Sequence, residues 1–126
     1  VYSGACKDYW IDSDGNEHIN NFYFPGDILG LESIPKRKHL FSSMTLKNTQ
    51  FCAIPIDSYL ELFSDSKNIM HRFINITSFK MQNDSQMCFT TNVRQRVANF
   101  ILNIYYRIEE RGLRVNPLYL PMSQID

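Results

Sequence analysis

The spacing of apolar positions follows the strand period in the first part of the chain. Short segments that mix aromatic and polar residues alternate with turn signals, which is typical of antiparallel strands. Asp14-Gly15 predicts a tight hairpin, because both central residues of such a turn need a positive φ. Pro25-Gly26 predicts a second turn. Lys47-Asn48 is expected to join two further strands, FSSMTL and TQFCAIPI, so this part is predicted to be a β-barrel or jelly roll.

The helical period takes over in the second part of the chain. Ser58 and Glu61 fit a capping box that would start a short helix. A longer helix is predicted from about residue 66 to residue 89, a span without glycine or proline. Asn92 is predicted to be the N-cap of a further helix, which ends at Arg111-Gly112.

The long predicted helix has apolar residues on more than one side. Six positions follow each other at alternating spacings of four and three, as in a coiled-coil seam: Met70, Ile74, Thr77, Met81, Asp84 and Cys88. Either the helix lies wholly inside one core, or it pairs with a second copy of the chain, which is the interpretation we favour. If Asp84 faces its mate, like charges weaken the pair. Alternatively Asp84 turns outward, and Ser85 or Met81 makes the contact.

Composition narrows the possible functions. The 126 residues favour one domain or a domain with a helical extension, and the 44% hydrophobic content is enough for a core. The formal net charge is zero, unlike that of a basic nucleic-acid-binding surface. No apolar run is long enough to span a membrane. The three cysteines are widely spaced and form no CxxC, which indicates a reducing, cytoplasmic setting. The opening at Val1, without a methionine, suggests a fragment.

Two motifs carry a family resemblance. FPGDILG at residues 24–30 follows a strand–hairpin–strand pattern, and QRVANFILNI at residues 95–104 follows the long predicted helix. Together they resemble the Crp/Fnr family of bacterial transcription regulators, and the Fnr branch fits best. TQFCAIP at residues 49–55 resembles a later strand of that branch, and LPMSQID at residues 120–126 resembles the opening of its winged helix-turn-helix domain. The resemblance covers essentially the whole chain.

The resemblance implies an α+β fold with three parts. Residues 1–65 would form a cyclic-nucleotide-binding-like β-roll, a double-stranded jelly-roll barrel, with a short helix. Residues 66–91 would form the dimerisation helix, and residues 92–126 the hinge, at Asn92 and Arg96, with the start of the DNA-binding domain. The implied partners are a second copy of the chain, DNA and RNA polymerase, and the implied signal is a small molecule or a redox change. The DNA-reading helix would lie beyond this sequence, so DNA binding is expected only of a longer protein.

The resemblance also bears on whether this chain binds cyclic AMP. In members that bind it, the glycine corner binds the phosphate through backbone N–H groups, a glutamate follows the second glycine, and an Arg-Ser pair grips the phosphate. Leu31 follows Gly30 here, Glu32 comes one position late, and neither Phe41-Ser42 nor Ser42-Ser43 supplies an arginine. We expect no cyclic AMP binding, while another small ligand could occupy the pocket. Its candidate residues are Gly26, Asp27, Gly30, Leu31, Glu32, Phe41, Ser42, Ser43, Met81 and Gln82.

Cys52 raises the question of an iron–sulfur cluster. Cluster-binding members of the branch place three cysteines in an N-terminal arm, and Cys52 stands where the resemblance places the fourth. A single thiolate cannot hold a cluster, so we expect no cofactor in this chain and a possible cluster only in the full-length protein. The alternative is a small buried residue in a strand. Cys88, near the seam, could form a disulfide between two subunits.

Two other functions compete with this reading. A small-ligand-binding regulatory domain that acts on a protein partner, rather than on DNA, would share the same fold. An enzyme on a cupin-like β-roll would need clustered metal ligands, but His18, His39 and His71 are isolated and no HxH occurs. The basic loop Lys36–His39 could supply a cation to the pocket, or it is simply solvated. The chain is therefore not expected to be an enzyme.

Overall fold

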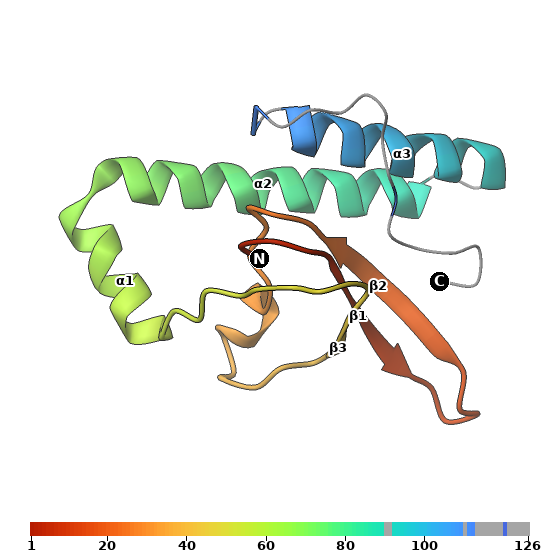
Figure 1. The fold of residues 1–126 in the computed structure, drawn as a ribbon, viewed down its shortest axis with the longest axis horizontal. Coiled ribbons are helices and arrows are strands. Elements are labelled where there is room, and N and C mark those ends of the chain that lie inside the picture. The colour runs from red at the N-terminus through yellow and green to blue at the C-terminus, as the bar shows by residue number, and fades with distance from the viewer. Residues whose placement is uncertain (90–91, 110, 113–119, 121–126) are drawn as a thin grey trace. The chain divides into compact units, whose positions relative to one another are not determined.

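The computed structural model describes residues 1–89, 92–109, 111–112 and 120. These residues contain one antiparallel sheet and three α-helices, which confirms the predicted α+β class (Figure 1). The chain divides into two compact units: one contains Val1–Ile54 with the sheet, and the other begins at Pro55 and contains the helices. The described strands do not establish a closed jelly-roll barrel, which stays a prediction.

The first two strands form the predicted hairpin. β1 (Cys6–Ile11) pairs antiparallel with β2 (Glu17–Tyr23), and the register shifts between Asp8 and Tyr9. Asp12 organises the turn, because its Oδ1 accepts the backbone N–H groups of Asp14 and Asn16 at 3.0 and 2.8 Å. Gly15 has a φ of 86°, as predicted, but Asp14 does not have a positive φ, so the expectation of a positive φ at both central residues is wrong.

The third strand completes the sheet. β3 (Ser42–Thr45) pairs with the other edge of β1, so the strand order is β2-β1-β3. The prediction that TQFCAIPI forms a further strand is wrong: within it only Gln50 forms a bridge, to Ser3, and residues 51–55 belong to neither strand nor helix. β2 and β3 occupy both edges of β1, and their own outer edges do not pair with this apolar run among the described residues.

The second unit begins with two consecutive helices. α1 spans Ile56–Asp65 and α2 spans Lys67–Phe89, so the long predicted helix is confirmed to within one residue. The prediction of a capping box at Ser58 and Glu61 is wrong, because α1 begins two residues before Ser58, with Pro55 as its N-cap. Proline lacks a backbone N–H and has a fixed φ, which suits a helix start.

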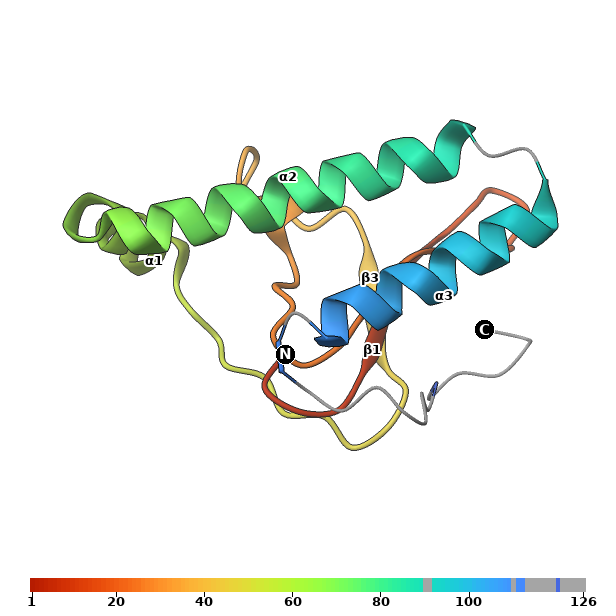
Figure 2. The ribbon, with the colours of Figure 1, turned by 90° about the horizontal axis from the view of Figure 1, so that it is seen from above.

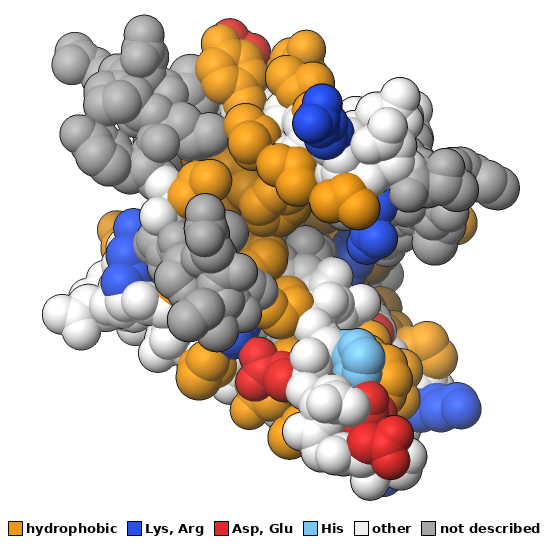
Figure 3. Space-filling model, turned by 90° about the vertical axis from the view of Figure 1, so that its right-hand side faces the viewer, with side chains coloured by type: hydrophobic (Ala, Val, Ile, Leu, Met, Phe, Trp, Pro, Cys, Tyr) orange, Lys and Arg blue, Asp and Glu red, His pale blue; other side chains and the backbone are white. Residues whose placement is uncertain are grey.

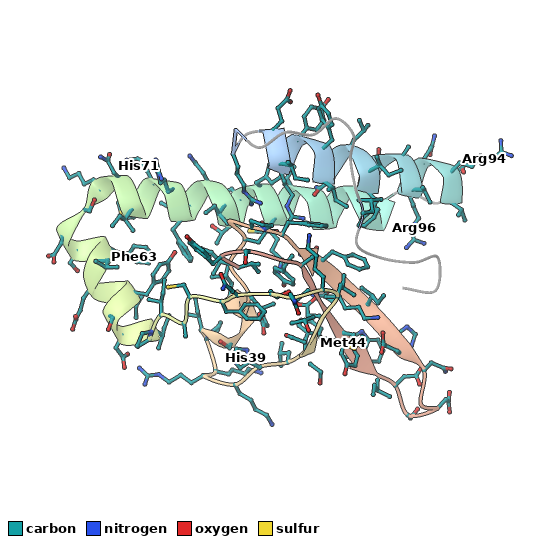
Figure 4. The ribbon with its side chains drawn as sticks, in the orientation of Figure 1. His39, Met44, Phe63, His71, Arg94 and Arg96 are labelled. Carbon is teal, nitrogen blue, oxygen red and sulfur yellow. The ribbon has the colours of Figure 1, made fainter. Side chains whose placement is uncertain are left out.

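An aromatic cluster joins the two helices. The chain changes direction at Ser66, whose backbone is extended, and α1 and α2 then run in different directions (Figure 1). Tyr59 and Phe63 of α1 pack their rings on Phe73 of α2, with ring centroids 5.6 and 4.9 Å apart. Figure 4 shows Phe63 on the side of α1 that carries these rings. The cluster therefore fixes the angle between the helices.

The last described helix, α3 (Val93–Glu109), touches α2 and runs beside it (Figure 2). Its predicted ends are confirmed: Asn92 Oδ1 accepts the N–H of Arg94 at 2.9 Å, and Gly112, with a φ of 68°, donates its N–H to the Glu109 carbonyl at 2.8 Å. Ile104 is buried. None of the described helices is long and apolar enough to cross a bilayer. Within LPMSQID, the expected start of the DNA-binding domain, residues 121–126 lie outside the described residues.

Candidate functional site

The FPGDILG corner is held together by its own hydrogen bonds. Asp27 is buried, and its Oδ2 accepts the backbone N–H of Phe24 at 2.7 Å. Its own N–H donates to the Phe24 carbonyl at 2.9 Å, which closes the turn. Gly26 has a φ of 90° and donates its N–H to the Val1 carbonyl at 2.9 Å. The carboxylate of Asp27 is therefore engaged in shaping the turn.

The second glycine of the corner is covered by a histidine from the basic loop. Gly30 has a φ of 87° and precedes a 3-10 turn, η1 (Leu31–Ser33). A Cβ placed on Gly30 would lie 2.8 Å from Cε1 of His39, so the imidazole ring rests against the backbone there. Nδ1 of His39 lies 3.2 Å from Oε1 of Glu32. Figure 4 shows His39 on the loop that precedes β3.

The remaining pocket candidates of this unit lie on or beside β3. Phe41 is half-buried, and Ser42 and Ser43 are exposed. Ser43 pairs with Asp8 of the central strand, and paired residues of antiparallel strands point to the same side of the sheet. The face that carries Ser43 therefore also carries Asp8.

Asp8 is a buried carboxylate that the sequence reasoning missed. It is 2% exposed, and no described side chain forms an ion pair with it. Oδ2 accepts the Tyr23 hydroxyl at 2.7 Å, and Asn20 Nδ2 lies 3.3 Å from both oxygens. Burial, and then the bond to Asp8, raise the pKa of Tyr23 far above its usual range, so the hydroxyl keeps its proton. An acidic residue between Cys6 and Trp10 in a central strand was the available signal.

The other candidate pocket residues belong to the helical unit. Met81 and Gln82 are exposed on α2. Along the predicted seam, Met70, Ile74 and Met81 are 38%, 48% and 71% exposed, and Thr77 is half-buried. The seam residues Asp84 and Cys88 lie in α2, but their side chains fall outside the described part.

Further apolar side chains are exposed on α3, and orange side chains are visible across the surface in Figure 3. Val93, Val97 and Ile101 are 70%, 52% and 40% exposed. The hinge candidate Arg96 is also exposed, and Figure 4 shows it projecting from α3. A surface hollow on α2 is lined by Asn68, Ile69, His71, Arg72 and Asn75. The helical unit therefore presents apolar surface on more than one helix.

The two described cysteines have opposite environments. Cys52 is exposed, so the alternative reading of it as a buried strand residue is wrong. Cys6 is the buried one, and burial raises the pKa of its thiol. No group of three or more potential metal ligands occurs among the described residues. Cys52 could offer one thiolate, but these residues do not by themselves form a cluster site.

A histidine–aspartate contact lies on the β1–β2 hairpin. Nε2 of His18 lies 2.7 Å from Oδ2 of Asp12, and the ring of Trp10 stacks on His18 with centroids 4.4 Å apart. The hydrogen bonds from His18 and then from Asn16 hold the pKa of Asp12 far below its usual range. This cluster rigidifies the turn.

Comparison with known proteins identifies relatives over the full chain, although no protein-family model matches it. The chain is 28% identical to the transcriptional activator protein Anr of Pseudomonas protegens, over 98% of the chain and 52% of that protein. It is 28% identical to the fumarate and nitrate reduction regulatory protein of Yersinia pestis and to the anaerobic regulatory protein of Haemophilus influenzae, over 100% of the chain in each case.

The chain spans about half the length of these curated relatives, covering 50–52% of each. By their names, all three are regulators, and none is an enzyme. The similarity therefore confirms the resemblance of this chain, over its whole length, to the Fnr-type transcription regulators of the Crp/Fnr family.

Proposed function

We propose that this chain is the signal-sensing and dimerising part of a Crp/Fnr-type, DNA-binding transcription regulator. The match of essentially the whole chain to proteins named as an activator and a regulator supports this assignment. The exposed apolar side chains of Met70, Ile74 and Met81 support a seam between two copies. In the whole protein, acting in the cytoplasm, the partners would be promoter DNA and RNA polymerase.

The signal, in this proposal, is a molecule other than cyclic AMP. The observation that carries this point is the segment at the start of β3, Phe41, Ser42 and Ser43, which contains no arginine. Neither Phe41 nor the two serines after it can supply the cation that a buried phosphate needs. Asp8, on the same face of the sheet as Ser43, adds a negative charge that would repel a phosphate.

Calorimetric titration of the chain with cyclic AMP tests the choice of signal. We expect no saturable binding at millimolar concentration. As a matched probe, Phe41→Arg restores a cation beside Ser42 without altering the glycine corner. Micromolar binding of cyclic AMP by the unsubstituted chain would overturn this part of the proposal.

DNA binding tests the larger assignment. The chain would be expressed together with the sequence that follows it in its gene, and its binding to promoter DNA measured by fluorescence anisotropy at two salt concentrations. Specific binding that weakens with salt is the expected result. If no DNA bound and the purified protein instead formed a defined complex with another protein, the alternative of a regulatory domain acting on a protein partner would replace it.

A further inference from the structure

The loop between η1 and β3 contacts the glycine corner through His39. The imidazole of His39 rests on the backbone of Gly30, where a Cβ would lie 2.8 Å from Cε1. The carboxylate of Glu32 holds the ring there through the 3.2 Å contact with Nδ1. The Glu32 side chain is 18% exposed and that of His39 is 68% exposed, so the contact lies at the surface and closes over the corner.

The same loop contains a strained residue. Arg37 has a φ of 50°, and it is the one described residue other than glycine in the left-handed region. A side chain in this region costs free energy, and such residues persist where their surroundings hold them, often at clamps and switches. The strain lies two residues before His39, so the contact at His39 and the backbone of Arg37 can change together.

We propose that residues 35–39 form a strap that is docked on the FPGDILG corner through His39 and closes it in the absence of a signal. Any ligand that approaches the backbone of Gly30 must displace the ring, and the released loop can then relax at Arg37. The idea that this corner receives a ligand rests on the proposed function. The docking of the strap does not, because it is a property of this chain alone.

The docked state has a direct signature in nuclear magnetic resonance spectra. An Overhauser contact between the His39 ring and the Gly30 α-protons is expected in the unsubstituted chain, because the ring rests on that residue. Ser33 donates its backbone N–H to the Gly30 carbonyl at 3.0 Å, so its amide exchange reports whether the turn that the His39 ring covers stays formed. Amides of the β1–β2 hairpin serve as an internal standard for the fold.

Three variants separate the strap from general effects. His39→Ala and Glu32→Gln should remove the Overhauser contact and accelerate exchange at Ser33 severalfold, while hairpin exchange stays unchanged. Arg37→Gly should slow exchange at Ser33, because glycine adopts a positive φ without strain. Lys38→Ala removes a neighbouring charge but keeps the His39 ring, so it should leave the amide exchange at Ser33 unchanged.

Two results would overturn the proposal. One is the absence of the ring contact in the unsubstituted chain, and the other is exchange at Ser33 that responds to Lys38→Ala as strongly as to His39→Ala. Neither result touches the proposed role in transcription, which the DNA-binding measurement decides. Conversely, a docked strap in a protein that binds no DNA would leave this inference standing.

Discussion

The hydroxyl of Tyr23 donates a 2.7 Å hydrogen bond to Oδ2 of Asp8, and this contact joins the side chains of β2 and β1 inside the sheet. Burial and the bond to Asp8 raise the pKa of Tyr23, so its hydroxyl is protonated and acts as the donor at neutral pH. The contacts of Asn20 with Asp8 are longer, at 3.3 Å. Tyr23 is therefore the principal partner of a buried charge.

Removing that hydroxyl should destabilise the sheet. Tyr23→Phe leaves the buried carboxylate of Asp8 with only the longer contacts, which should lower the free energy of unfolding by about 1–3 kcal/mol. Urea denaturation measures the change. Tyr9→Phe in β1 is the matched control, because the Tyr9 hydroxyl makes no hydrogen bond among the described residues. Equal losses in the two variants would contradict the assigned role of the Tyr23–Asp8 bond.

The hairpin turn should give the protein a defined acid dependence. The folded-state pKa of Asp12 is depressed by His18 and Asn16, so its contribution to stability is complete above the ordinary aspartate pKa of about 4 and is lost as the pH falls toward the depressed value. Asp12→Ala should therefore destabilise the chain at pH 7, and the gap between variant and unsubstituted chain should narrow at pH 2.

Urea midpoints at the two pH values provide the measurement. Asp14→Ala is the control, because Asp14 contributes its backbone N–H to the same turn. Asp14→Ala should change the urea midpoint very little at either pH. A gap for Asp12→Ala that is as wide at pH 2 as at pH 7 would show that the carboxylate is not linked to folding.

The side chain of Asn92, which caps α3, should stabilise the fold by about the free energy of one hydrogen bond. Asn92→Ala removes the acceptor for the Arg94 N–H and should cost about 1 kcal/mol. Asn92→Asp keeps an acceptor at the same place and should restore most of that loss. Far-ultraviolet circular dichroism during thermal unfolding follows both variants. If alanine and aspartate behaved alike, the side chain would not act as the cap.

The two described cysteines should differ sharply in reactivity. In a Cys88→Ser background, an aromatic disulfide reagent should label exposed Cys52 within minutes at pH 8, while Cys6 should react only as fast as the protein unfolds. The raised pKa of the Cys6 thiol adds to the protection given by burial. Adding Cys52→Ala should abolish the fast phase. A fast phase that survived this substitution would mean that Cys6 is accessible.

Signals that act over a few residues could be predicted from the sequence. Asp14-Gly15, Pro25-Gly26, Asn92 and Gly112 each predict a turn or a cap through local preferences, and these turns and caps are confirmed, although the positive φ expected of Asp14 is not found. The long helix was equally clear, because no glycine or proline interrupts its period. These features need no knowledge of what packs against them.

Features that depend on distant partners could not be predicted in this way. TQFCAIPI has the composition of a strand, but a strand forms only where its backbone pairs with another segment, and within this run only Gln50 does so, with Ser3. Ser58 was predicted to cap the short helix, but α1 begins earlier, with Pro55 as its N-cap. Asp8 and Tyr23 are 15 residues apart, and their contact depends on the register of the hairpin. The position of His39 over Gly30 depends on the path of the loop and on the contact with Glu32, seven residues away.

The central claim is that α2 pairs this sensor with a second copy of itself, and sedimentation equilibrium tests it most directly. We predict a reversible dimer whose dissociation constant rises at least about tenfold in Ile74→Glu, because a carboxylate buried in an apolar seam costs more than about 1.4 kcal/mol. The neighbouring Asn75→Glu, outside the seam, should leave the constant unchanged. A chain that stays monomeric up to several hundred micromolar, or equal effects of the two substitutions, would contradict the account.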